Sequence, residues 1–202
     1  MMKPTRMKFF NPTIEKSAIS QMPTVSFEGR IITIDSQNEA ERAARALSQE
    51  KLLGIDTETR PSFRKGVHHE VSLLQLSTAD TCFLFRLCRT GLTDGLKALL
   101  EDSNIKKVGL SLHDDFHMLN KRRNFTPGGF IELQKYVADF GIEEMSLQKI
   151  YAIIFAQRIS KSQQLTNWEA DVLTDKQKLY AATDAWVCLN IYNHLEELKN
   201  NK

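Results

Sequence analysis

The sequence predicts a mixed α/β fold, in which one β-sheet is covered by helices on its faces. Short runs of β-branched and aliphatic residues dominate residues 52–112, where at least three strands are expected. Strands then alternate with helices, and helical patterns fill most of the chain up to residue 198. This order of elements is typical of a mixed sheet flanked by helices.

Length and composition fit a single globular domain. A chain of 202 residues buries a sizeable core without disulfides or a structural metal. Hydrophobic residues make up 42% and charged residues 26%, and the formal net charge is only +2. So small a charge excludes a protein that binds nucleic acid over its whole surface, and any phosphate-binding surface is expected to be a local patch.

The cysteines and the apolar segments bear on the cellular compartment. Cys82, Cys88 and Cys188 are an odd number without metal-ligand spacing, which favours a reducing compartment over a disulfide scaffold. No stretch reaches the roughly 18 apolar residues of a membrane span, and the N-terminus lacks the apolar centre of a signal peptide. We therefore expect a cytoplasmic protein.

The chain divides into an arm and one domain. Residues 1–28 hold three of the five prolines and show little periodicity, so we expect an N-terminal arm that is partly disordered or loosely packed. Residues 29–202 contain no linker and are expected to form one domain.

The first half of the domain is rich in strands. Residues 30–35 (RIITID) are a β-branched run, and a charged amphipathic helix is expected at residues 38–51. Residues 52–58 (LLGIDTE) are expected to be a strand that is buried at its start and polar at its end. Residues 71–77 and 82–87 are expected to form a hairpin about a polar turn.

The second half of the domain alternates strands and helices before it becomes helical. A helix is expected at 91–101, a strand at 107–112 (KVGLSL) and a helix at 113–123 that follows this strand directly. A short strand is expected at 130–133, and the last long helix at 174–198.

Two acidic residues stand where a strand ends. Asp56 and Glu58 project to the same side of their strand because side chains alternate between faces. Two such anions repel each other unless a cation compensates them, and Mg²⁺ prefers carboxylates together with water and phosphate oxygens. An acid-x-acid pair also occurs by chance roughly three times in this composition, so a solvated strand end is the alternative.

A third acidic residue follows the predicted strand at 107–112. Asp115 stands beside Asp114 at the start of the next helix, where the helix macrodipole favours both. For Asp114 the structural interpretation is preferred. For Asp115 a structural and a functional role are equally compatible with its position alone.

A tyrosine and an aspartate share one face of the last helix. Tyr180 and Asp184 are four residues apart, and small or apolar residues surround them. A buried aspartate without a partner costs several kcal/mol or becomes neutral, and a metal ion resolves this cost. A structural hydrogen bond between the tyrosine and the aspartate is the alternative.

These three elements together resemble the Exo motifs of the DEDD exonucleases. The sequence has Asp56-Thr57-Glu58, then Asp115 after a Val-Gly-x-x-Leu run, then Tyr180-x-x-x-Asp184. Tyrosine at 180, with leucine at 179 where the histidine branch has its histidine, indicates the tyrosine (DEDDy) branch. The segments 159–170 and 180–185 are similar to ribonuclease D and to the exonuclease domain of the Werner syndrome helicase.

The resemblance covers residues 30–198 and implies a ribonuclease H-like fold with the first motif in the central strand. It implies a metal-dependent 3′-5′ exonuclease that uses two Mg²⁺ or Mn²⁺ ions and releases 5′-nucleoside monophosphates. In this family pattern Asp56, Glu58 and Asp184 hold the first ion. Asp56 also contacts the second ion, and Asp115 contacts it directly or through water. Tyr180 is then expected to orient the attacking water, because a free phenol with a pKa near ~10 is a poor base at neutral pH.

Four residues are candidate substrate contacts. Thr57 lies between the two carboxylates of the first motif, and Arg60 begins the loop that follows it. Such a basic loop contacts phosphates or is merely solvated. Lys161 and Trp168 lie before the last helix, in a region that borders the cleft in the family, and packing in the core is the alternative for Trp168. Glu132 stands where the family often has aspartate after a short strand and is not counted as catalytic.

Two other functions remain open at this point. A ribonuclease H-like module that binds nucleic acid or protein without cutting would lack a metal carboxylate, and none of the expected ones is missing. A phosphodiesterase for short oligonucleotides is compatible with the modest charge. The expected partner is the 3′ end of a DNA or RNA strand, with a protein partner as a further hypothesis for the N-terminal arm.

Overall fold

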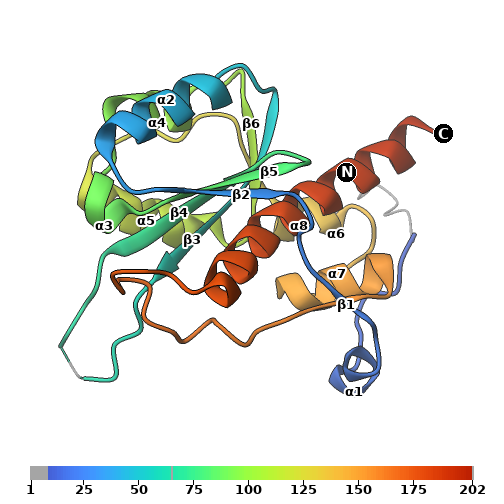
Figure 1. Cartoon of the computed structure of the whole chain (residues 1–202). Helices are drawn as coiled ribbons and strands as arrows, with labels where there is room; N and C mark the ends of the chain where they lie inside the picture. The colour runs from blue at the N-terminus through green and yellow to red at the C-terminus, as the bar shows by residue number, and fades with distance from the viewer. Residues whose placement is uncertain (1–8, 65, 202) are drawn as a thin grey trace.

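The computed structural model describes residues 9–64 and 66–201, and its centre is a six-stranded sheet (Figure 1). Its strand order is β2-β5-β4-β3-β6-β7. The strands are β2 (Arg30–Ile34), β3 (Leu52–Thr59), β4 (Val71–Ser77), β5 (Thr81–Phe85), β6 (Lys106–Gly109) and β7 (Phe130–Glu132). β4 is antiparallel to β3 and β5, and the other neighbours are parallel. The predicted mixed sheet is therefore confirmed, and the carboxylate-bearing strand β3 lies inside it.

Helices cover both faces of this sheet. On one face, a core of aliphatic side chains is shared with α2 (Gln37–Leu47), α3 (Leu87–Thr90), α4 (Asp94–Glu101) and α5 (Leu112–Arg122). The other face packs against α6 (Leu133–Ala138), α7 (Leu147–Phe155) and α8 (Asp175–Asn200). Figure 1 shows α8 lying across the sheet on the face opposite to α2 and α4. In the described part of the chain, no helix is both long and apolar enough to cross a membrane.

The contact between β3 and α8 is unusually close. A Cβ atom added at Gly54 would lie 2.0 Å from the carbonyl oxygen of Ala185, so only glycine fits at this point of the strand. On the helix side, Ala181, Ala182 and Ala185 are fully buried and present only methyl groups. Small residues on both elements thus bring the strand and helix backbones together, and this contact lies next to Asp56 and Asp184 in the sequence.

The start of α8 is fixed by a capping box. The Thr174 hydroxyl accepts a hydrogen bond from the Gln177 amide, and the Gln177 side chain accepts one from the Thr174 amide. The Gln177 side-chain amide also donates to the Thr166 hydroxyl at 3.0 Å. The segment before α8 is therefore attached to the first turn of the helix that carries Tyr180 and Asp184.

The N-terminal segment packs along this same side of the molecule. Its first eight residues lie outside the described part of the chain, so the expected arm is described only from residue 9 onward. There, α1 (Lys16–Ser20) buries Ile19, and β1 (Thr24–Val25) pairs in parallel with β8 (Arg158–Ile159). Strands of two residues are too short to show an alternating pattern, and this pairing was not predicted.

Two expected elements differ from the observed ones for backbone reasons. The strand expected at 107–112 ends at Gly109, because Ser111 adopts a left-handed conformation (φ 62°) as the chain turns directly into α5. The helix expected at 91–101 begins only at Asp94, where Thr93 accepts a hydrogen bond from the Leu96 amide. Gly91 (φ 64°) separates it from the short helix α3.

Candidate active site

Three carboxylates meet where β3 and α8 cross. One oxygen atom from each of Asp56, Glu58 and Asp184 lies within 4.8 Å of the others. Asp56 and Glu58 share a face of β3 with Gly54 because strand side chains alternate, and this is the face that α8 covers. We refer to Asp56, Glu58 and Asp184 as the β3–α8 triad.

Burial raises the pKa of every carboxyl group in the β3–α8 triad. For Asp56 and Glu58, burial is the larger cause, and the charge of Asp184 adds to it. Burial also raises the pKa of Asp184 to about 7, although the Tyr180 hydroxyl and the charge of Lys161 oppose the shift. Three converging anions with raised pKa values bind either protons or a compensating cation.

Asp115 approaches the site from the other face of the sheet. The Thr57 hydroxyl donates a hydrogen bond to Oδ1 of Asp115. Burial raises the pKa of Asp115 to about 6, against the opposing effect of this hydrogen bond. Asp115 is thus tied to β3 through Thr57 and does not belong to the β3–α8 triad.

Tyr180 lies beside the triad, and its ring packs against the ring of Trp168. The two rings have centroids 6.0 Å apart, and Trp168 is fully buried. Burial, followed by the charges of Asp184 and Glu58, raises the pKa of the Tyr180 phenol. The phenol is therefore protonated at neutral pH and serves as a hydrogen-bond donor.

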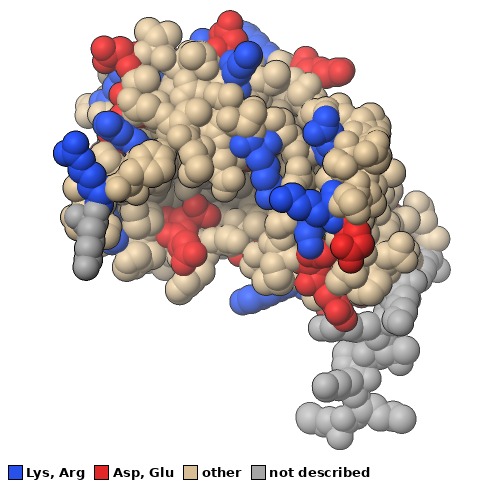
Figure 2. Space-filling model, turned by 90° about the horizontal axis from the view of Figure 1, so that it is seen from below, with Lys and Arg blue, Asp and Glu red and all other residues tan. Residues whose placement is uncertain are grey.

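The β3–α8 triad lines a cleft with a volume of about 370 Å³. The start of α7 forms one wall of this cleft, and the end of β8 forms another. The two walls are joined by Gln148 of α7, whose side-chain amide donates a hydrogen bond to the Ile159 carbonyl at 2.8 Å. Among the described residues that line this cleft, Lys161 is the only basic one. The face seen in Figure 2 shows acidic side-chain atoms beside a hollow, with Lys and Arg side chains on either side.

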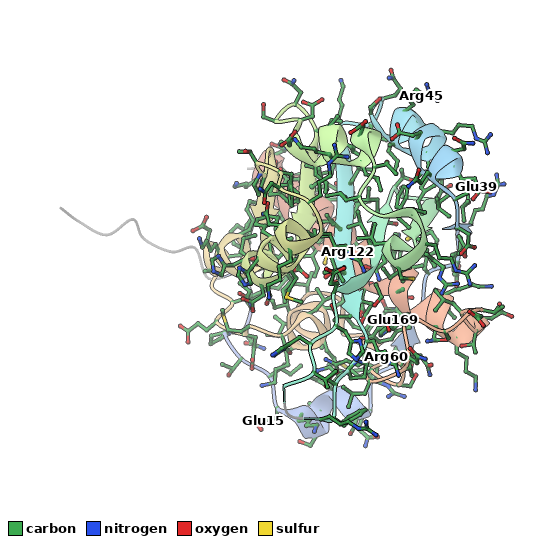
Figure 3. The ribbon with its side chains drawn as sticks, turned by 90° about the vertical axis from the view of Figure 1, so that its left-hand side faces the viewer. Glu15, Glu39, Arg45, Arg60, Arg122 and Glu169 are labelled. Atoms are coloured by element: carbon green, nitrogen blue, oxygen red, sulfur yellow. The ribbon has the colours of Figure 1, made fainter. Side chains whose placement is uncertain are left out.

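The candidate substrate contacts are placed differently from one another. Thr57 and Lys161 line the cleft. Arg60 instead pairs with Glu169, with Nη1 and Oε2 3.2 Å apart, and Figure 3 shows these two side chains next to each other. Trp168 is fully buried, so its position corresponds to the packing role and not to direct contact with a substrate.

Three residues that the sequence did not single out as functional also shape the site. Glu169 accepts from Arg60 and lies 3.4 Å from Nδ1 of His69, so it joins the loop after β3 to the segment before α8. Gln75 pairs with Asp56 across β3 and β4, and its buried side-chain amide has no hydrogen-bond partner among the described residues. Glu132 binds the start of α5. Of these three, the sequence showed Glu132 at the end of a short strand and Gln75 among the leucines of β4, and it gave no signal for Glu169.

The donor set fits a divalent metal ion. Carboxylate oxygens are the ligands that hard cations such as Mg²⁺ and Mn²⁺ prefer, and the β3–α8 triad supplies three of them at one point. The raised pKa values show that this arrangement is electrostatically costly without a cation. The buried side-chain amide of Gln75, on the strand position opposite Asp56, has no hydrogen-bond partner among the described residues. This is expected where a further polar group completes the site.

Comparisons with known proteins all find similarity to 3′-5′ exonucleases. The family model described as "3'-5' exonuclease" matches residues 31–199. The bifunctional 3′-5′ exonuclease/ATP-dependent helicase WRN of Mus musculus is 30% identical over 197 residues, which cover 92% of this chain and 14% of the relative. A 3′-5′ exonuclease of Arabidopsis thaliana is 28% identical, with 87% of this chain and 67% of that protein covered.

A solved structure shares the fold. The EXO domain of Aedes aegypti Nibbler superposes with a TM-score of 0.77 at 22% identity, covering 86% of this chain and 92% of that domain. The family match contains all four acidic residues and the tyrosine described above.

Proposed function

Because this chain belongs to the 3′-5′ exonuclease family, we propose that it removes nucleotides one at a time from the 3′ end of a nucleic-acid strand by metal-dependent hydrolysis. The observation that carries the proposal is the β3–α8 triad, whose three carboxylates converge in a cleft beside a protonated tyrosine. The chain spans only 14% of the WRN relative, so the activity and substrates of that whole protein do not transfer to it directly.

We propose that the site takes two Mg²⁺ or Mn²⁺ ions. The β3–α8 triad would hold one ion, and Asp56 together with Asp115 would hold the other. Two ions bound there would stabilise both the attacking and the leaving oxygen of an in-line displacement at phosphorus.

The chain's own residues would position the reactants. Tyr180 keeps its proton at neutral pH, so it would orient the attacking water by a hydrogen bond to its phenol oxygen and would not act as the base. Lys161 on the cleft wall would contact a phosphate of the strand. Arg60 is engaged by Glu169, so a phosphate must compete with that ion pair to reach it. Cleavage of the bond between the last bridging phosphorus and the 3′ oxygen of the penultimate nucleotide would release a 5′-nucleoside monophosphate and leave a new 3′ hydroxyl on the strand.

The test is a time course on 5′-labelled single-stranded and recessed DNA and RNA, with Mg²⁺, Mn²⁺ or EDTA. We expect a ladder that shortens from the 3′ end, requires metal and is absent with Asp56→Ala. The relative rates on DNA and RNA then identify the sugar that the site accepts. If no substrate is shortened although calorimetry shows metal bound to the wild type, the exonuclease proposal fails and a binding module replaces it.

A further inference from the structure

Glu132 lies at the junction between the sheet and the helix that carries Asp115. It is the last residue of β7 and pairs with Gly109, the last residue of β6. The chain leaves β6 there, turns through Leu110 and Ser111, and enters α5. The carboxylate of Glu132 is thereby placed next to the first turn of α5.

Both oxygens of this carboxylate accept backbone hydrogen bonds from the start of α5. Oε1 accepts from the amide of Ser111 at 3.0 Å, and Oε2 accepts from the amide of Leu112 at 2.8 Å. Oε1 also accepts from the amide of Gln134 at 3.1 Å. A helix begins with unsatisfied amides, and Ser111, the residue that precedes α5, makes no side-chain capping bond of its own. Glu132 therefore caps α5 from a neighbouring strand.

The turn that Glu132 holds has an unfavourable backbone conformation. Ser111 has φ 62° and ψ 32°, a left-handed conformation that non-glycine residues seldom adopt. Its hydroxyl accepts a further hydrogen bond from the side chain of Gln134 at 3.0 Å. Such a backbone persists only where its surroundings impose it, and at this point Glu132 and Gln134 do so.

We propose that Glu132 is a positioning residue for Asp115, and this proposal rests on the proposed function. Asp115 lies in the first turn of α5, one turn from the amides that Glu132 binds, and it contacts β3 through Thr57. The orientation of α5 is set by this first turn, so Glu132 determines where Asp115 lies relative to Asp56. Both oxygens of Glu132 are already engaged by amides, which distinguishes its role from that of a metal ligand.

The test compares Glu132→Ala and Glu132→Gln with Thr93→Ala. Thr93 is the N-cap of α4 and lies outside the cleft, near the C-terminal end of α5, so its loss destabilises the fold without touching the first turn of α5. For Glu132→Ala we expect faster hydrogen exchange at the amides of Ser111 and Leu112. We also expect about a tenfold higher Mn²⁺ concentration for half-maximal activity, a lower kcat and an unchanged KM. Glu132→Gln keeps one acceptor and should lie between Glu132→Ala and the wild type.

Two results would overturn the positioning role. One is a Mn²⁺ dependence of Glu132→Ala that equals that of Thr93→Ala at matched loss of stability. The other is a change in KM alone, which would place Glu132 on the substrate side. An inactive wild type would refute the proposed function instead, while the hydrogen-exchange comparison would still report whether Glu132 holds the turn.

Discussion

The two halves of the site are built in different ways. The β3–α8 triad lies where two long elements are in direct backbone contact, at Gly54 and Ala185. Asp115 comes from a helix that starts at a left-handed serine and is capped from another strand. The first arrangement depends on small residues that let the two backbones approach closely. The second depends on a few hydrogen bonds around an unfavourable turn.

This difference predicts how each half responds to change. Close packing of strand and helix is preserved by many side chains at once, so the triad should keep its geometry when a single hydrogen bond is lost. The α5 half has fewer supports, so the loss of one of them should move Asp115. We therefore expect the triad to bind metal independently and Asp115 to be the adjustable part of the site.

The largest effect is expected for Asp184→Asn. It replaces one of the three converging carboxylates with a neutral amide, and loss of several kcal/mol of transition-state stabilisation lowers the cleavage rate by about 10³-fold or more. The unfolding temperature without metal should not fall, because a repelling charge is also removed. Steady-state cleavage and circular dichroism check this prediction, and a folded variant with the wild-type rate would contradict it.

Gly54→Ala should separate the strand from the helix. The added Cβ would lie 2.0 Å from the Ala185 carbonyl, and such overpacking costs about 1–3 kcal/mol of the free energy of unfolding. We expect weaker binding of the first metal ion together with this loss, as measured by urea unfolding and Mn²⁺ titration.

A control for Gly54→Ala is Gly91→Ala. Gly91 has a positive φ of 64° and open space around its Cβ position, so alanine is strained there without touching the site. This variant should lose stability yet bind Mn²⁺ as the wild type does. Equal metal affinity in both variants would show that the backbone contact at Gly54 does not maintain the triad.

Thr57→Val tests the link between β3 and Asp115. Valine has a similar shape but cannot donate the hydrogen bond to Asp115, so we expect about a tenfold loss in activity or in affinity for the second metal. Thr57→Ser retains the hydroxyl and should behave like the wild type. If valine and serine give the same rate, the hydrogen bond is not what places Asp115.

The smallest predicted effect concerns pH. Carboxyl groups with raised pKa values hold protons more tightly in the folded than in the unfolded protein. Their contribution to stability is complete below pH ~4 and is lost as pH rises through about 6 for Asp115 and about 7 for Asp184. Metal ions replace these protons, so Mn²⁺ should raise the unfolding temperature more at pH ~8 than at pH ~5.5.

The expected difference between the two pH values is at least about 3 °C, the shift that ~1 kcal/mol gives in a chain of this size. Differential scanning fluorimetry with and without Mn²⁺ measures it. The double variant Asp115→Asn/Asp184→Asn should show a much smaller difference. An equal metal-induced shift at both pH values in the wild type would contradict the pKa changes.

The sequence predicted the fold and the carboxylates because both follow local patterns. Alternation along β3 placed Asp56 and Glu58 on one face, and the four-residue spacing placed Tyr180 and Asp184 on one helix face. The structure brings Asp56, Glu58 and Asp184 together as this pattern requires. The roles of the individual residues remain predictions until variants are measured.

The contacts that hold the site residues in place could not be predicted from the sequence, because they join residues that are far apart in the chain. Glu132 reaches α5 only because β7 pairs with β6 in a register that aligns it with Gly109. Glu169 meets Arg60 across more than a hundred residues, so a basic loop that looked free to bind phosphate is engaged in an ion pair. The left-handed Ser111 also ended a strand that the apolar pattern extended to Leu112.

The most direct test of the two-part site is a calorimetric titration of Mn²⁺ into the wild type and Asp115→Asn. We predict two ions for the wild type, and for Asp115→Asn a single ion bound with the affinity of the first wild-type site. Loss of all binding in Asp115→Asn, or two ions bound as in the wild type, would contradict a site built from an independent β3–α8 triad and an adjustable Asp115.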